Sequence, residues 1–340
     1  MGTRTAALAL ALGLAVLAGG LQAAGYDAGA ALAALWRGAA GSWYAFTSAT
    51  LVRAIPLIII GLGVALGFRA GAFNIGAEGQ FYAGAIAATW VGLHVAGWPP
   101  VPAVALVLAT ATLAGAAWVV VPVWLKLRFD VMEVISTLLL SFVAESLVSL
   151  MVQGPLQEAQ HIYPQSDPIA AAARLPLLPG TRLHAGLLLA LVAAVALWYL
   201  FRRTLWGFRL KAVGAGPRAA ELSGRIDAGR VAAGALLGSG ALAGLAGGVE
   251  VSGVSYALFQ NLSPGYGFTA IAVALLARLH PLGVLASGLL FGALEAGAGA
   301  MQRDAGVPAV AVYVVEAVVL IVVLLAEAAA RRTPAERASS

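Results

Sequence analysis

The sequence has 340 residues, of which 61% are hydrophobic and only 10% are charged. A soluble domain usually carries about 25% charged residues, so this composition excludes an ordinary soluble domain and indicates an integral membrane protein. The apolar runs are about 20 residues long, enough for a helix to cross roughly 30 Å of hydrocarbon, and they lack the alternation of barrel strands. We therefore predict an all-α polytopic membrane protein.

The net charge of +5 comes from 20 basic and 15 acidic residues. The basic residues cluster at the ends of apolar segments, where cytoplasmic loops retain them, so their distribution indicates membrane topology and no nucleic-acid partner. The sequence contains no cysteine, which excludes disulfides, thiol nucleophiles and cysteine-ligated metals. Membrane lipid is the partner that composition alone implies.

The first half of the chain contains apolar runs that each fit one transmembrane helix. We place these helices at residues 6–24, 44–68, 81–95, 101–125 and 131–152, with an external connection at 25–43. The small residues near 21–24 resemble a signal-peptidase site. A retained first helix is preferred, because the later segments need a cytoplasmic start for the basic loops to fall inside.

A polar, glycine-interrupted segment, RAGAFNIGAEGQ, precedes the third helix at residues 69–80. Its glycines separate the polar residues Asn74, Glu78 and Gln80. Glycine permits non-helical backbone, so the segment predicts a broken or re-entrant start to that helix.

A proline-rich external loop at residues 154–182 leads into the second half of the chain. Its helices are predicted at 184–201, 231–251, 261–277, 282–301 and 307–328, with a strongly basic cytoplasmic loop at 202–230. About ten helices result, with both termini cytoplasmic. The chain is predicted to form one transmembrane domain, 1–340, whose halves, 1–153 and 183–328, are inverted repeats of five helices.

The third helix of each half begins with a glycine-interrupted polar segment, at residues 71–80 and 261–268. Paired broken segments in inverted halves indicate a transport pathway. The alternative is that these glycines only allow close helix packing. Aromatic residues near both segments offer stacking surfaces for a planar solute, or belong to interfacial belts.

Four acidic residues fall inside predicted helices: Glu145, Glu250, Glu295 and Glu316. A charge at the centre of a membrane helix costs roughly 2.5 to 3.5 kcal/mol on insertion scales. Each acid could therefore serve proton transfer or solute contact. Pairing with a neighbouring hydroxyl or backbone group, or a position near the interface, is the simpler explanation.

Signatures of enzyme chemistry are missing from the sequence. Neither Lys126 nor Lys211 is followed by the Ser or Thr of a Walker A motif, and the four histidines lack metal-ligand spacing. The glycines of 214–219 imitate a dinucleotide fingerprint, but the required βαβ unit does not fit before the next helix. We predict no catalytic residue, no metal and no cofactor in this chain.

The basic loop contains a predicted short helix. Pro217 suits a first helical position, and Gly224 suits a stop after it. So short a cytoplasmic helix has no core of its own, so it lies on the membrane or fits a partner's groove. Small Ala219 and Ala220 favour the groove.

Almost the whole chain, from roughly residue 55 to 325, resembles permease subunits of ABC importers in the branched-chain amino acid, ribose and nucleoside superfamily. The resemblance is nearest to nucleoside permeases that work with BMP-family binding lipoproteins. The segments that carry it are RAGAFNIGAEGQ (69–80), EVIST (133–137), GFRLKAVG (207–214), SGALAGLAG (239–247) and SPGYGFTAIAVALL (263–276).

The resemblance implies a cytoplasmic coupling helix that inserts into a separate ATPase subunit, which would hold the ATP and Mg²⁺. The implied coupling residues are Gly214, Pro217, Arg218, Ala219, Ala220, Glu221 and Gly224. Two positions depart from the family: Arg218 stands where Glu often occurs, and Ser141 where many relatives carry Asn. A second permease subunit and an extracytoplasmic solute-binding lipoprotein are the other implied partners.

We therefore predict the permease subunit of an ABC importer in a prokaryotic cytoplasmic membrane, moving a small uncharged solute, with a nucleoside or nucleobase as the preferred class. The predicted pathway residues are Phe73, Asn74, Glu78, Gln80, Ser136, Thr137 and Tyr266. One alternative is a pentose or other simple-sugar permease of the same architecture. Another is a secondary transporter driven by ions through the intramembrane glutamates.

Overall fold

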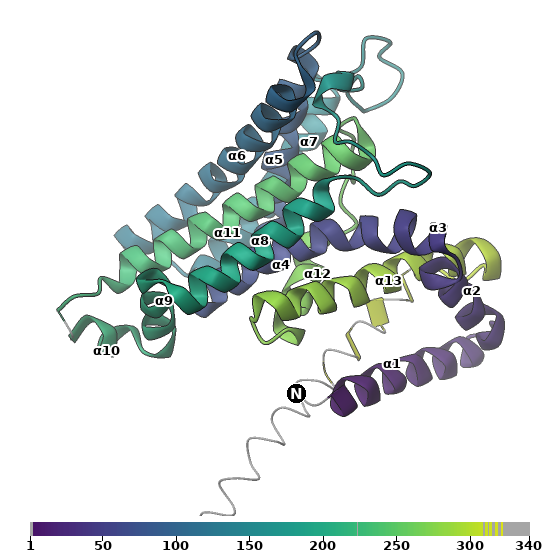
Figure 1. Cartoon of the computed structure of the whole chain (residues 1–340), viewed down its shortest axis with the longest axis horizontal. Coiled ribbons are helices and arrows are strands. Elements are labelled where there is room, and N and C mark those ends of the chain that lie inside the picture. The colour runs from purple at the N-terminus through teal and green to yellow at the C-terminus, as the bar shows by residue number, and fades with distance from the viewer. Residues whose placement is uncertain are drawn as a thin grey trace, which may run out of the picture. The chain divides into compact units, whose positions relative to one another are not determined.

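The structure is a computed structural model that describes residues 3–222, 224–308, 310, 311, 313, 314, 317, 318 and 321. These residues form helices, turns and two isolated β-bridges, with no β-strand among them (Figure 1). The all-α prediction is confirmed. Glu316 and most of the predicted helix 307–328 lie outside the described residues.

Six helical segments in the described part are long and apolar enough to cross a membrane. They are Trp43–Arg69, Pro100–Phe129, Glu133–Val152, Gly186–Arg203, Ala228–Ser255 and Pro281–Ala305. Each overlaps a predicted transmembrane helix. The predicted count of ten, and the inverted repeat, stay predictions.

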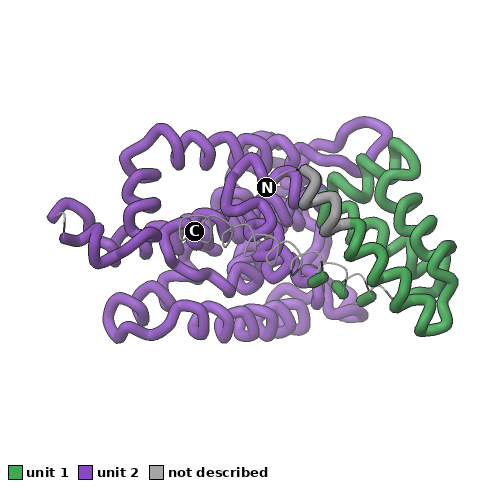
Figure 2. The backbone as a smooth tube through the Cα atoms, turned by 90° about the horizontal axis from the view of Figure 1, so that it is seen from below, with its two compact units in different colours: residues 1–53, 290–340 green, residues 54–289 purple. Residues whose placement is uncertain are grey.

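The chain divides into two compact units, residues 1–53 with 290–340, and residues 54–289 (Figure 2). The division falls within the helices α4 (Leu51–Arg69) and α13 (Pro281–Ala305). Each unit has helices from both predicted halves of the chain, so compact packing does not follow the predicted halves.

Unit 1 contains α1 (Thr3–Ala23), α2 (Ala28–Ala40), α3 (Trp43–Ala45) and the π-helical turn η1 (Phe46–Thr50). The predicted connection 25–43 thus holds a helix of its own, α2, capped by Asp27, whose side chain accepts from the Ala30 N–H at 2.9 Å. Leu21, Leu35 and Met301 belong to one buried apolar cluster within this unit.

The centre of unit 2 consists of α5 (Ala77–His94), α6 (Pro100–Phe129) and α11 (Ala228–Glu250), which pack on one another, with α7 (Glu133–Val152) against α5. Glycines allow this approach. A methyl group on Gly115 of α6 would collide with the backbone of Gly240 and Gly244 of α11. Small residues at such contacts are typical of helix packing in membranes.

The predicted basic loop 202–230 is largely helical. After α8 (Gly186–Arg203), the chain forms α9 (Leu205–Ala215) and the short α10 (Pro217–Leu222) before α11 begins. The sequence predicted α10, with Pro217 at its first position, but not α9. Gly224 adopts the left-handed conformation, φ 67°, that a stop after the helix requires.

The helix predicted at 261–277 is shorter in the structure. An irregular segment follows the π-helical turn η3 (Val251–Ser255), and α12 covers only Tyr266–Leu276. Eleven residues rise about 16 Å, so α12 alone is too short to cross a bilayer. The broken start before α12 agrees with the prediction, and a membrane span at this position stays a prediction.

Candidate transport pathway and coupling site

The segment between α4 and α5 is non-helical, as predicted. The α4 helix ends at Arg69 and α5 begins at Ala77, four residues earlier than expected. Gly71 turns the backbone with a φ of 74°. The intervening residues include Asn74, whose side chain is 0% exposed.

Asn74 and Gln80 form a reciprocal amide pair. The Asn74 Nδ2 donates to Gln80 Oε1 at 2.7 Å, and the Gln80 Nε2 donates to Asn74 Oδ1 at 2.8 Å. Asn74 Nδ2 also donates to Ser239 Oγ on α11 at 2.9 Å, and the Gly76 N–H donates to Asn74 Oδ1 at 3.1 Å. Buried amides need such partners. The pair therefore holds the break rigidly in this conformation.

The α7 helix packs closely along the same break. The Ile75 N–H donates to Thr137 Oγ1 at 3.3 Å, and the Gly79 N–H donates to Ser141 Oγ at 3.2 Å. Thr137 and Ser136 also donate back to carbonyls of their own helix. Of the two predicted pathway hydroxyls, Thr137 therefore contacts the break, whereas Ser136 donates to the Glu133 carbonyl within α7.

The two predicted polar segments meet directly. The Gly267 N–H, at the start of α12, donates to Glu78 Oε2 of α5 at 2.6 Å. The Ser263 Oγ accepts from the Gly265 and Tyr266 N–H groups at 3.0 and 2.9 Å. The Tyr266 ring lies 5.9 Å from that of Phe81. Glu78, Gln80 and Tyr266 are thereby gathered at one joint.

Phe73 lies apart from this buried joint. Its side chain is 47% exposed and packs edge-on against Phe68, with 5.0 Å between ring centroids. Its backbone N–H donates to Glu133 Oε1 at 3.5 Å. Of the seven predicted pathway residues, Phe73 is the one whose side chain is half exposed.

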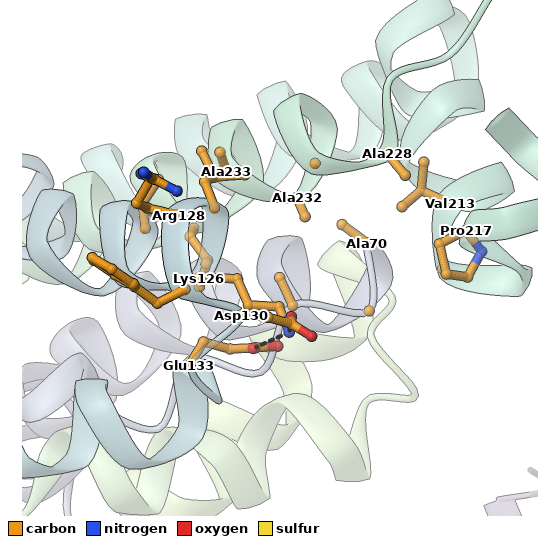
Figure 3. Close-up of a pocket in the computed structure, with 18 residues that line it drawn as sticks. Ala70, Lys126, Arg128, Asp130, Glu133, Val213, Pro217, Ala228, Ala232 and Ala233 are labelled. Atoms are coloured by element: carbon orange, nitrogen blue, oxygen red, sulfur yellow. Dashed lines mark ion pairs between the residues drawn. The ribbon is translucent and has the colours of Figure 1, made fainter. Parts of the chain in front are cut away.

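A cavity of about 730 Å³ opens beside the break (Figure 3). Ala70, Gly71 and Ala72 line it together with the α6–α7 turn, the end of α9, Pro217 and the start of α11. The topology predicted from the basic residues places this cavity on the cytoplasmic side. Two predicted coupling residues, Gly214 and Pro217, line it, whereas the predicted pathway residues do not.

Charged groups gather on one wall of this cavity. The Lys126 Nζ lies 2.8 Å from Asp130 Oδ1 and 3.6 Å from Glu133 Oε2 (Figure 3). Asp130 adopts a left-handed conformation, φ 52°, that ends α6. Its hydrogen bond to the Lys126 ammonium holds the pKa of the Asp130 carboxyl below its usual value. The turn thus presents paired charges.

The α9 helix contacts the break through its backbone. A methyl group on Gly214 would collide with the Arg69 carbonyl oxygen, and Gly71 lies near the Gly214 Cα. Only a residue without a side chain allows this approach. The coupling residue predicted at Gly214 therefore adjoins the start of the predicted pathway.

The α9 and α10 helices also border a second cavity of about 710 Å³. Ala219 and Ala220, both predicted coupling residues, line it together with Phe208 and Arg225. Large apolar side chains are exposed nearby, with Phe208 at 63% and Leu222 at 89% exposure. Exposed apolar groups of this size outside the candidate spans are typical of a docking site.

Two residues of the joint, Ser239 and Ser263, were missing from the predicted site, and so was Glu133, which accepts from the Phe73 N–H. Ser239 is the single hydroxyl in the run GSGALAGLAGG, residues 238–248. A lone polar residue inside so apolar a segment is a signal that could have found it. Among the described residues, no group of three or more acidic, histidine or cysteine side chains is placed to hold a metal ion.

Six apolar helices of spanning length, together with a buried polar break after α4, define a multi-pass helical membrane protein. The family described as branched-chain amino acid transport system / permease component matches residues 46–324. The chain belongs to this family of ABC transporter permeases.

Two relatives illustrate the range of the family. The chain is 40% identical to the glucose ABC transporter permease protein TsgB13 of Haloferax volcanii, over 82% of this chain and 75% of the relative. It is 37% identical to the guanosine ABC transporter permease protein NupP of Bacillus subtilis, over 93% and 91%. No solved structure gave a significant match.

Proposed function

We propose that this permease imports an uncharged, hydrogen-bonding solute, and that the solute is a nucleoside or nucleobase. The observation that carries the proposal is the joint at Glu78 and Gly267, where polar groups of two broken helices meet inside an apolar helical unit. Broken helices that meet in a membrane protein are typical of a solute path. The 37% sequence identity to NupP, over 93% of this chain, supports the nucleoside class.

In this proposal the path follows Asn74, Glu78, Gln80, Ser136, Thr137 and Tyr266, with Phe73 at its cytoplasmic end. The amide pair of Asn74 and Gln80 keeps the path closed in the present conformation, since each amide satisfies the other. Opening would separate the pair, and a solute with donors and acceptors would replace its hydrogen bonds. An apolar solute would leave both amides unsatisfied.

Separate ATPase subunits would drive this opening from the cytoplasm and would hold the ATP and Mg²⁺, so this chain needs no nucleotide site. Gly214, Pro217, Arg218, Ala219, Ala220, Glu221 and Gly224 form the proposed docking segment. The exposed Phe208 and Leu222 support it. An extracytoplasmic binding lipoprotein would deliver the solute, and a second permease subunit would complete the membrane part.

The proposed location is a prokaryotic cytoplasmic membrane, with both termini inside. The distribution of basic residues supports this orientation, because Lys126, Arg128 and Arg230 then lie on the side that retains positive charge. The same orientation places the large cavity and α9 and α10 toward the ATPase.

The test is uptake of radiolabelled guanosine by cells that co-express this permease, its ATPase and its binding protein. Guanosine uptake should require the ATPase and resist a protonophore when ATP is held constant. Asn74→Ala and Gln80→Ala should reduce it at normal expression. Unchanged uptake in both variants would remove them from the path.

A simple-sugar permease is the second candidate, favoured by the 40% identity to TsgB13. Competition of labelled guanosine uptake by adenosine, ribose and glucose separates the two classes. Adenosine should compete at much lower concentrations than ribose or glucose. An ion-driven secondary transporter would instead lose uptake with the protonophore and ignore the ATPase.

A further inference from the structure

A smaller and more polar cavity, of about 310 Å³, lies between α5, α7 and the irregular segment before α12. Polar residues make up most of its lining: Tyr82, Glu145, Ser146, Ser149, Gln260 and Asn261. Its volume is at the lower end of the range for small-molecule sites, roughly 300 to 1,000 Å³. The size suits a sugar ring better than a whole nucleoside.

Glu145 gives this cavity its chemistry. It lies on α7 seven residues before the last one, Val152, and therefore about 10 Å along the helix from that end. Among the described residues its carboxylate has no hydrogen bond or ion pair, and it interacts electrostatically with the Glu78 carboxyl. A carboxylate in a membrane helix needs water, a partner or a ligand. The cavity is where such a ligand fits.

The neighbouring groups leave both donors and acceptors available. Ser149 Oγ accepts from Gln260 Nε2 at 2.6 Å and from Gln153 Nε2 at 2.7 Å, so its own proton can donate elsewhere. The Oε1 of Gln260 can accept. Ser146 Oγ donates to the Phe142 carbonyl at 2.8 Å and retains its capacity to accept.

We propose that this cavity binds the vicinal diol of a ribose or hexose ring, with the two oxygens of Glu145 accepting one hydrogen bond from each hydroxyl. A carboxylate accepts two parallel bonds, and bonds to a charged acceptor are about twice as strong as neutral ones. The Ser149 hydroxyl and the Gln260 amide complete a site for an uncharged polyol. Anionic solutes are repelled by the same carboxylate.

This inference rests on the proposed import of a nucleoside or sugar and names the part of the solute that is recognised. Tyr82 follows the Gln80 of the joint by two residues, and Asn261 precedes Ser263 by two. The cavity therefore adjoins the joint on the side that the predicted topology places outward. In the proposed path, the cavity is the outer binding site, which the solute reaches before the closed pair of Asn74 and Gln80.

The test measures solute binding to the permease assembled with its partner permease and ATPase subunits in lipid nanodiscs, without the binding protein. Saturation-transfer NMR detects weak ligands, and the probes are guanosine, 2′-deoxyguanosine and glucose. Glu145→Gln should weaken guanosine binding about 10- to 100-fold, and 2′-deoxyguanosine binding less than about twofold. Glucose reports whether a hexose diol also binds.

Asp304→Asn is the matched control, since it makes the same change of carboxylate to amide in the Arg37–Asp304 pair of unit 1, where the two side chains lie 3.6 Å apart. It should leave guanosine binding unchanged. If the Glu145→Gln protein does not assemble, Gln260→Ala is the second variant to measure. It should also weaken the binding of guanosine more than the binding of 2′-deoxyguanosine.

Equal effects of Glu145→Gln on guanosine and 2′-deoxyguanosine would overturn the diol site, and so would no effect on either. Both results would leave ATP-dependent guanosine uptake by the wild type intact. Conversely, a wild type that binds glucose with Glu145 dependence but never imports guanosine would keep the diol site and reject the nucleoside proposal.

Discussion

The joint around Asn74 and the surface of α9 and α10 differ in whether their side chains already have partners within the chain. At the joint, amides, hydroxyls and Glu78 are buried and paired with one another. On α9 and α10, Phe208 and Leu222 are left exposed. A polar break whose hydrogen bonds are all made within the chain stabilises one conformation, whereas an exposed apolar surface is available to bind a partner. Stability should therefore depend on the joint, and assembly on the surface.

The largest effect is expected for Gly76→Val at the joint. A side chain there would collide with the Thr137 backbone on α7, which cannot move without displacing its helix. We expect a loss of about 3 kcal/mol in the free energy of unfolding and no assembled complex. Thermal unfolding of the purified protein measures it. Gly19→Val on α1, where nothing lies within 4 Å, should change little.

A second buried polar group, His184, tests whether burial without full pairing is enough for stability. Its Nδ1 accepts from the Gly186 N–H at 3.2 Å, so the neutral ring carries its proton on Nε2, which has no partner within the described residues. Burial lowers the pKa of His184 to about 4 from 6.5. Protonation is thus easier in the unfolded chain.

Stability from His184 is therefore complete above pH 6.5 and declines as the pH falls toward 4. At pH 5 the loss should be about 2 kcal/mol. Melting temperatures at pH 7.5 and 5.0 measure it, with His184→Gln as the variant that cannot titrate. The same decrease in both proteins would assign the effect to other groups.

Asn74→Ala should cost less than the glycine change. It leaves the buried Gln80 amide without its partner, at about 1 to 3 kcal/mol. Because the two amides satisfy each other, Asn74→Leu combined with Gln80→Leu should cost less than the sum of the single changes. Denaturation of the four proteins forms the cycle. Additive costs would mean that the pair is not a unit.

The smallest effect on the isolated chain is expected at the α9 and α10 surface. Phe208→Asp should leave the melting temperature unchanged and weaken ATPase binding about tenfold or more. Leu178→Asp is the matched control, since Leu178 is 48% exposed in the predicted external loop. Pull-down of the ATPase measures both. Equal binding by the two variants would remove Phe208 from the docking surface.

Arg218→Glu should change that affinity less, because an exposed ion pair contributes about 0 to 1 kcal/mol. Stimulation of ATPase activity by the permease is the sensitive measurement. Unchanged stimulation and assembly would exclude a charge-specific contact at Arg218.

The apolar helices were predictable because their composition is uniform and their ends carry charge or proline. The expected 131–152 agrees with α7, Glu133–Val152, within two residues. By contrast α9, Leu205–Ala215, mixes Trp, Arg and Lys with Gly, so it lacks the pattern of a span and the sequence predicts a loop there. The 13-residue α2 was missed because 13 residues rise only about 20 Å, so the helix has no signature of a span.

The polar segments were recognisable in the sequence, but their partners were not. Asn74 pairs with Ser239, 165 residues away, and Gln260 pairs with Ser149, 111 residues away. Local spacing contains no signal for contacts at such separation. Only the packing of α5 against α7, α11 and α12 fixes them, which is why the joint could be foreseen as two separate breaks and not as one.

The contact of Gly214 with the Arg69 carbonyl joins two backbones with no side chain between them. Side chains absorb small displacements by changing rotamers, but two touching backbones have no such freedom. A displacement of the α9 backbone should therefore displace the backbone of residues 69–71 by a similar distance. If an ATPase docks on α9 and α10 as proposed, the outer side chains of these helices could change without altering the length of the movement that reaches the break.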